Sequence, residues 1–326
     1  MDYLSIIRQP IVSELNDFNA LFEQALSEAD NAMLENVLGY IKKRGGKRMR
    51  PILTLLMAKS FGQVSDSTQH AALALELLHT ASLVHDDVVD ESDERRGQAS
   101  VNASFTNKVA VLVGDYILST ALLHVAYTGQ PKIVEELALL GRTLASGELL
   151  QLSSVQKQEI SEDLYFDIIY QKTAVLFAVS AAIGAMSAGA HEGDIEGARQ
   201  FGKQLGLMFQ IRDDIFDYFD DASIGKPTGN DMKEGKLTLP VIYALNKSQD
   251  ANMIALAYKV KEGSANTDEI ARLVDFTKLQ GGIEYAEHSM DNLGSLCKQY
   301  IDEYIKEKAI RDSLTAYVDY VVQRSY

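Results

Sequence analysis

Apolar and polar positions recur along this chain with the three- to four-residue period of amphipathic α-helices. In residues 31–43, for example, Leu34, Val37, Leu38 and Ile41 form one apolar stripe. The period-two alternation of strands is scarce. The pattern therefore predicts an all-α fold, with a helix opening at Pro51 and further helices at 4–28, 31–43, 67–91, 109–127, 132–152, 163–190, 194–220, 240–261, 267–279, 281–306 and 308–323.

One stretch, 173–190, has no charged residue over 18 positions, which reaches the lower length limit of a membrane-spanning helix. It is rich in Ala, Ser and Gly rather than in Leu and Ile, so it predicts a core helix packed closely by small side chains. Residues 1–10 lack the apolar block of a signal peptide. These features predict a soluble, cytoplasmic protein.

The composition agrees with helices throughout, because only five prolines and no tryptophan occur among 326 residues. No linker separates two domains, so the chain predicts a single domain spanning 1–326. The net charge of −15 argues against a nucleic-acid partner. The single cysteine, Cys297, excludes an intrachain disulfide and fits a reducing compartment.

Candidate chemistry lies at the end of the predicted helix 67–91. With Asp86 at 0° and about 100° per residue, Asp87 falls at about 100° and Asp90 at about 40°, so three carboxylates share one face with His79 below them. Like charges this close need a cation between them, and hard oxygen ligands suit Mg²⁺. Because Arg95 and Arg96 follow, and Arg suits phosphate oxygens, the segment predicts a diphosphate site.

A second copy of this spacing strengthens the hypothesis. Asp213, Asp214 and Asp217 repeat it at the end of another apolar pattern, with Gln210 below them on the same face. An acid-rich helix end is usually only a solvated face. Two such faces, each rising from a long apolar helix, favour a paired metal site.

Together these motifs resemble the trans-polyprenyl diphosphate synthases, a family with a first and a second aspartate-rich motif. Three more segments carry the resemblance: the basic glycine turn at 45–51, the Lys172-Thr173 pair, and residues 225–240 with their Gly-Lys-Pro and Gly-Lys-Leu-Thr-Leu-Pro runs. The matches span 45–240. The resemblance implies a single large helical bundle of the isoprenoid synthase type, with more than ten helices around a central cavity.

The resemblance also implies a reaction: Mg²⁺-dependent, successive condensation of isopentenyl diphosphate with an allylic diphosphate. Catalysis would depend on Asp86, Asp87, Asp90, Asp213, Asp214 and Lys172, and about three Mg²⁺ ions would be held by these aspartates with Asp217. The isopentenyl diphosphate would contact Lys47, Arg50, His79 and Arg96. The allylic diphosphate would contact Arg95, Lys172, Thr173, Gln210, Lys226 and Lys236. A homodimer and transient membrane contact during product release are further expectations.

Ala81 and Ser82 bear on the length of the product. Their small side chains leave space beneath the first aspartate motif. The resemblance implies that bulky aromatic residues at these two positions would close the cavity and stop chain growth at a short product. Their absence predicts a medium or long all-trans chain, such as a quinone side chain. Small residues that merely allow close helix packing remain the alternative.

Three other functions stay open. A terpene cyclase would usually replace the second aspartate motif with an Asn/Ser/Glu metal motif and would not need a second diphosphate site. A farnesyl or geranylgeranyl diphosphate synthase would differ only in product length. A non-catalytic regulatory subunit should have lost one aspartate motif or the arginine pair, and this chain keeps both.

Overall fold

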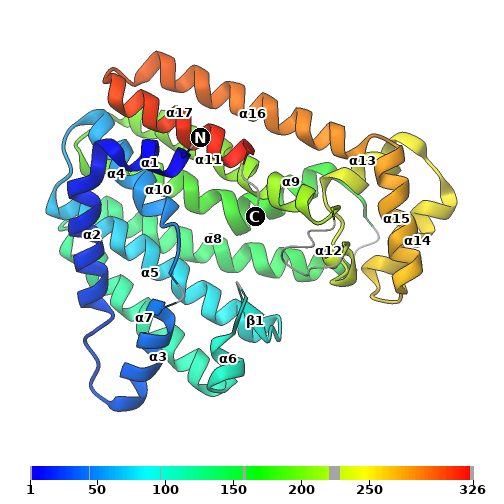
Figure 1. The fold of residues 1–326 in the computed structure, drawn as a ribbon, viewed down its shortest axis with the longest axis horizontal. Helices are drawn as coiled ribbons and strands as arrows, with labels where there is room; N and C mark the ends of the chain where they lie inside the picture. The colour runs from blue at the N-terminus through cyan, green and yellow to red at the C-terminus, as the bar shows by residue number, and fades with distance from the viewer. Residues whose placement is uncertain (1, 44, 96, 157–158, 220–227, 324–326) are drawn as a thin grey trace. The chain divides into compact units, whose positions relative to one another are not determined.

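The computed structural model describes residues 2–43, 45–95, 97–156, 159–219 and 228–323 (Figure 1). Within these ranges the only strands are β1 (Glu94–Arg95) and β2 (Gln98–Ala99), which pair antiparallel. The prediction of an all-α fold is confirmed. The chain divides into two compact units: unit 1 comprises 1–141, 179–199 and 305–316, and unit 2 comprises 142–178, 200–304 and 317–326. A single domain over 1–326 stays a prediction.

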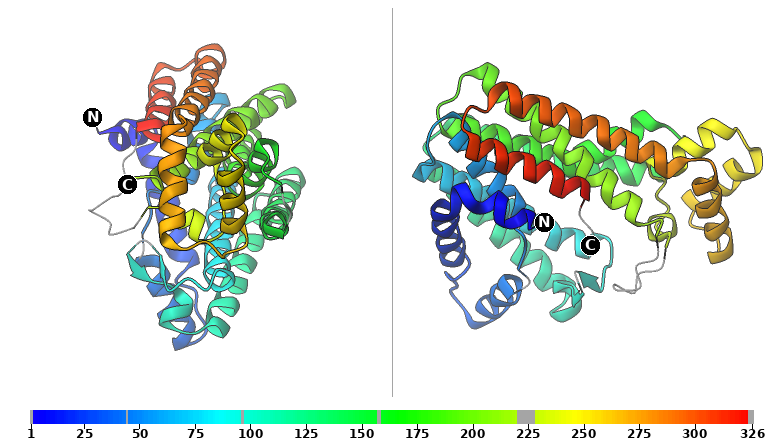
Figure 2. Two further views of the ribbon diagram at one scale, coloured as in Figure 1. Left: turned by 90° about the vertical axis from the view of Figure 1, so that its right-hand side faces the viewer. Right: turned by 45° about the horizontal axis from the view of Figure 1, so that its top comes forward.

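Unit 1 is built mainly from the N-terminal helices. Its helices that lie wholly within 1–141 are α1 (Tyr3–Arg8), the 3₁₀ turn η1 (Gln9–Ile11), α2 (Val12–Ala25), α3 (Ala32–Lys43), α4 (Met49–Phe61), α5 (Asp66–Val89), α6 (Val101–Ser104) and α7 (Asn107–Tyr127). The long helix α5 begins at a capping box formed by Ser65 and Thr68. α5 and α7 pack along each other and lie side by side in every view (Figures 1 and 2).

Unit 2 holds the helices that follow residue 141. α8 (Pro131–Gln156) enters it, and its other helices are α9 (Glu162–Ile169), the π-helical turn η2 (Tyr170–Ala174), α10 (Val175–Ser187), α11 (Glu192–Phe216), α12 (Asn230–Lys233), α13 (Leu239–Ser248), α14 (Ala251–Lys261), α15 (Thr267–Leu279), α16 (Gly282–Tyr304) and α17 (Lys308–Gln323). Of these, α8, α10, α11 and α17 also contribute residues to unit 1. α13, α15 and α16 pack together, and α14 packs on α15.

Several predicted boundaries were wrong, each for a local reason. The span 4–28 is interrupted at η1, where Pro10 lacks the N–H of a continuous α-helix. The span 240–261 is two helices, because Gln249 adopts a left-handed φ of 53° and Asp250 caps α14. Pro51 is the third residue of α4, not the first. The segment between Gly97 and α7, for which the periodicity predicted no element, contains β2 and α6.

Two described helical stretches are long and apolar enough to cross a membrane on those criteria alone. In Glu162–Ser187, 72% of the most apolar window is buried, and residues 174–185 are buried without exception, as in a core helix. In Asn107–Tyr127 only 39% of the window is buried. α7 therefore exposes apolar side chains that unit 1 does not cover.

Candidate active site

The first aspartate set lies at the C-terminal end of α5 in unit 1. Asp86 is half-buried, Asp87 is 1% exposed, and Asp90 is an exposed residue one position past the last helical residue, where it caps the helix. Asp87 Oδ1 accepts a hydrogen bond from Arg95 Nε at 2.5 Å. The three carboxylates of the predicted face therefore have different surroundings. Asp87 is buried against an arginine, whereas Asp86 and Asp90 are more exposed to solvent.

The hairpin explains how Arg95 reaches Asp87. The chain reverses after α5 through Glu91, whose φ is 50°, and again at Gly97, whose φ is 73°. These turns return β1 toward the helix end, so Arg95 pairs with a carboxylate eight residues earlier. Arg96, predicted to bind isopentenyl diphosphate, lies outside the described residues.

The other residues predicted for isopentenyl diphosphate belong to α4, its entry turn and α5. Lys47 is exposed, and its carbonyl accepts a hydrogen bond from Arg8 Nη2 at 3.3 Å. Arg50 is half-buried in the first turn of α4, and His79 is half-buried in α5, which packs on α4. Their role in binding stays a prediction. Ala81 is 2% exposed, and the hydroxyl of Ser82 donates to the carbonyl of His79 at 2.9 Å.

The second aspartate set lies at the end of α11 in unit 2, and its middle carboxylate is held on both oxygens. Asp214 is 4% exposed; its Oδ2 accepts from the hydroxyl of Tyr165 at 2.6 Å, and its Oδ1 accepts from Gln210 Nε2 at 2.8 Å. Gln210 Oε1 in turn accepts from the hydroxyl of Thr173 at 2.8 Å. These bonds fix Asp214 relative to α9 and η2.

Asp217 binds the backbone of a later segment, and its role as a metal ligand stays a prediction. α11 ends at Phe216, so Asp217 does not continue the helical face. Its two carboxylate oxygens accept from the backbone N–H groups of Asn230 at 3.0 Å and Asp231 at 3.1 Å, at the start of α12. Asp217 thereby anchors the segment that leads to Lys236.

Lys172 and Thr173 project from the π-helical turn η2, a local widening that is often found at functional sites. Two glycines allow neighbouring helices to approach this turn. A Cβ atom at Gly147 would lie 2.8 Å from Gln171 Cβ, and one at Gly206 would lie 2.5 Å from Ala174 Cα. The turn is thus clamped between α8 and α11, which fixes where Lys172 begins.

The ammonium of Lys172 contacts two side chains of α8. Its Nζ lies 2.8 Å from Glu148 Oε2 and 2.8 Å from Gln151 Oε1. Neither residue was predicted from the sequence, although their spacing of three places both on one helix face. Tyr165 was also missed, since nothing in an apolar segment signals a bond to a carboxylate 49 residues away.

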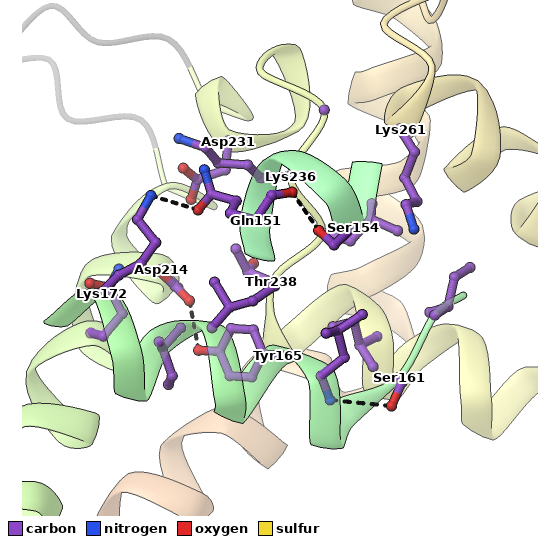
Figure 3. Close-up of a pocket in the computed structure, with 18 of the residues that line it drawn as sticks. Gln151, Ser154, Ser161, Tyr165, Lys172, Asp214, Asp231, Lys236, Thr238 and Lys261 are labelled. Atoms are coloured by element: carbon purple, nitrogen blue, oxygen red, sulfur yellow. Dashed lines mark hydrogen bonds between the residues drawn. The ribbon is translucent and has the colours of Figure 1, made fainter. Parts of the chain in front are cut away.

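A pocket in unit 2 collects many of these groups (Figure 3). Lys172, Asp214, Asp231 and Lys236 lie toward one side of it, and Ser161 and Lys261 toward the other. Lys236 pairs with Glu234. Apolar residues complete the wall: Ile160, Leu164, Ile168, Ile169, Leu237 and Ile242. Lys226, predicted for the allylic diphosphate, lies outside the described residues.

Burial makes the carboxylates of this pocket hard to ionise. Burial, with the Asp231 charge next, raises the pKa of Asp214 well above its usual range. Burial, followed by the charge of Asp217, raises the pKa of Asp231 to about 7. Burial also raises the pKa of Asp217, against the opposing effect of its backbone hydrogen bonds. A cation placed among these groups would favour their charged forms.

The carboxylates of the two aspartate sets could supply only part of the ligand shell of an Mg²⁺ ion. Among the residues that the structure describes, no three His, Cys, Asp or Glu side chains converge as a ready-made metal cluster. Mg²⁺ usually takes one or two protein carboxylates and completes its octahedron with water and substrate phosphate, so it does not need such a cluster. The hard carboxylate oxygens of the two sets fit that mode of binding.

A pocket with carboxylates, lysines and apolar walls suits the diphosphate ester of a hydrocarbon chain. These features are those of the class of prenyl-transferring enzymes. Residues 31–277 match the family model described as polyprenyl synthetase. The octaprenyl diphosphate synthase of Escherichia coli (strain K12) is 38% identical over 262 residues, 76% of this chain and 81% of that protein.

Solved structures agree with this result over the whole chain. A geranylgeranyl pyrophosphate synthase from Bacteroides thetaiotaomicron has a TM-score of 0.87 and 48% identity, covering 99% of this chain and 100% of that one. A decaprenyl diphosphate synthase from Rhodobacter capsulatus has a TM-score of 0.91 and 33% identity, covering 98% of each. The chain belongs to the polyprenyl synthetase family, as the resemblance predicted.

Proposed function

We propose that the protein is an Mg²⁺-dependent polyprenyl diphosphate synthase that adds isopentenyl diphosphate repeatedly to an allylic diphosphate and makes a medium or long all-trans product. The observation that carries the proposal is the pocket of unit 2, where Lys172 and Lys236 lie beside the buried carboxylate Asp214 and the half-buried Asp231. The lysines supply hydrogen-bond donors for a diphosphate, and the carboxylates supply oxygen ligands for the metal that accompanies the diphosphate.

The reaction requires stabilisation of the negative charge on the leaving diphosphate and does not require a protein nucleophile. The carbon–oxygen bond of the allylic diphosphate breaks, and the electron pair leaves with the diphosphate. Lys172 and Lys236 bind and orient that anion, and Thr173 and Gln210 hold Asp214 in place beside it. Mg²⁺, about three ions per site, would be held by Asp86, Asp87, Asp90, Asp213, Asp214 and Asp217, and when bound it neutralises charge on the diphosphate.

The second substrate supplies the new bond. The double bond of isopentenyl diphosphate attacks the allylic carbon, and a proton from the adjacent carbon then passes to the released diphosphate. Lys47, Arg50 and His79 of unit 1 would hold this substrate, together with Arg96. Because Asp87 is buried against Arg95, we assign this pair the added task of orienting the arginine toward phosphate.

The product length follows from α5 in this proposal. Ala81 is small and buried one turn before the first aspartate set, and Ser82 lies next to it. Relatives include octaprenyl, decaprenyl and geranylgeranyl diphosphate synthases. Small residues at 81 and 82 favour the longer products among these.

The exposed face of α7 supports a homodimer. Val111, Leu112, Leu122, Leu123 and Tyr127, here called the α7 apolar face, are between 41% and 59% exposed. Apolar side chains gathered on one helix mark a protein or membrane contact. We assign the face to a second copy of the chain in a cytoplasmic enzyme, with membrane contact only during product release.

The test is incubation of the purified protein with farnesyl diphosphate, labelled isopentenyl diphosphate and Mg²⁺, with products separated by chain length. We expect a ladder that ends at one dominant length, and its loss in Asp86→Ala and in Asp213→Ala. A folded protein that incorporates no label with any allylic primer would overturn the proposal and favour a regulatory subunit.

A further inference from the structure

The imidazole of His85 joins the first aspartate set to α7. His85 directly precedes Asp86 in the last turns of α5, and its Nε2 lies 3.2 Å from the carbonyl oxygen of Val111. The same nitrogen lies 3.5 Å from Asp115 Oδ1. A ring that carries its proton on Nε2 donates to the Val111 carbonyl, so α7 holds the side chain by a directed contact.

α7 has a notch that receives this ring. A Cβ atom at Gly114 would lie 2.2 Å from His85 Nε2 and 2.5 Å from its Cδ2, which is far inside van der Waals contact. The imidazole therefore occupies the volume that any other residue at 114 would need. The contact lies within unit 1, between two helices that pack along each other (Figure 2).

The end of α5 depends on such contacts, because the helix stops four residues later. Asp90 caps it by donating its N–H to the carbonyl of Asp86 at 2.8 Å, and Glu91 then turns the chain with a φ of 50°. A helix end frays unless side chains hold it. His85 is placed to prevent this directly beside Asp86 and Asp87.

We propose that His85 is a positioning residue: seated in the notch at Gly114, it fixes the directions in which Asp86 and Asp87 leave α5. The inference rests on the proposed role of these aspartates in binding metal and diphosphate. Val111, which accepts the hydrogen bond, also belongs to the α7 apolar face. A second copy of the chain docked on that face would contact Val111, whose carbonyl oxygen accepts the hydrogen bond from His85.

The experiment measures the affinity of the protein for inorganic pyrophosphate in the presence of Mg²⁺ by calorimetry, together with kcat and KM. His85→Ala should weaken pyrophosphate binding about tenfold, the usual scale for groups that orient metal ligands. His85→Gln, whose amide reaches toward the same carbonyl, should recover part of the affinity. Thermal melting separates this loss from unfolding.

Gly114→Ala should reproduce the defect by displacing the ring. Its matched control is Gly141→Ala in α8, where a Cβ atom would lie 3.7 Å from Leu78 Cδ1 of α5, an ordinary contact. This control should bind pyrophosphate as the wild type does. In the double variant, Gly114→Ala should add nothing to His85→Ala, because the displaced ring is already absent.

Two results would overturn the inference: wild-type affinity in His85→Ala, or losses that simply add in the double variant. Failure of the proposed function looks different. In that case the wild-type protein itself would neither bind pyrophosphate with Mg²⁺ nor transfer a prenyl group.

Discussion

Replacement of Tyr165 by Phe tests whether the second aspartate set depends on the hydrogen bonds beneath it. Tyr165 is 5% exposed, and its hydroxyl donates to Asp214 Oδ2 at 2.6 Å. Burial, with the charge of Asp214, raises the pKa of Tyr165, so the hydroxyl stays a neutral donor at every working pH. Phe removes one oxygen atom and keeps the ring.

The magnitude follows from the burial of the acceptor. A buried carboxylate oxygen that loses its donor costs about 1 to 3 kcal/mol. If that cost falls on the reacting complex, the rate drops by about 5- to 150-fold. The hydroxyl also favours the charged form of Asp214, so its removal raises the pKa of that carboxyl further. As the pH is lowered, the variant should therefore lose activity at a higher pH than the wild type, because its Asp214 becomes protonated earlier.

The assay is kcat/KM for the allylic diphosphate at saturating isopentenyl diphosphate, measured from about pH 5.5 to about pH 9, a range that includes the pH at which buried carboxyls titrate. We expect a lower plateau and an acid limb displaced to higher pH. Tyr285→Phe is the matched control, because the Tyr285 hydroxyl donates to a different carboxylate of the same unit, Glu162, at 2.8 Å. Equal profiles for Tyr165→Phe and the wild type would refute the positioning role.

Three further outcomes are expected. Ala81→Tyr should shorten the dominant product by at least one five-carbon unit while turnover persists, read by chromatography; an unchanged product would remove Ala81 from the elongation path. Asp231→Asn should flatten the pH dependence of stability in urea unfolding without Mg²⁺. The reason is that a carboxyl whose pKa rises from 3.8 to about 7 on folding stabilises the protein at low pH and loses that contribution as pH rises through about 7; equal slopes would contradict this. Leu112→Asp should dissociate the proposed homodimer in sedimentation, whereas Leu279→Asp, at an 84% exposed position outside the α7 apolar face, should not; a dimer that survives Leu112→Asp would place the interface elsewhere.

Helical periodicity predicted most of the fold because it reports burial, and burial is what the long helices share. α5, α7 and α11 lie where their apolar stripes indicate. The missed breaks are backbone events that periodicity does not report. Gln249 adopts a left-handed φ of 53° between the apolar stripes of α13 and α14, and its residue type does not mark the break. The π-helical turn at η2 adds no residue type that would reveal it.

The aspartate spacing predicted which residues matter but not how each acts. A motif fixes sequence separation, whereas the role of a carboxylate depends on what other segments bring to it. Asp87 stays in the last turn of α5 and pairs with Arg95, whereas Asp217 lies past the end of α11 and accepts from the first N–H groups of α12. Glu148 and Tyr165 come from segments with no acidic motif of their own.

A chain with a net charge of −15 binds a polyanion better if its site holds a cation in place and limits its own negative charge. The pocket of unit 2 does so in two ways. Glu148 and Gln151 hold Lys172 at a fixed position, and burial disfavours the ionised forms of Asp214 and Asp231 while no cation is present. A substrate that arrives with metal ions restores the charged carboxylates. Metal and diphosphate should therefore bind with positive cooperativity, since each makes the site suitable for the other.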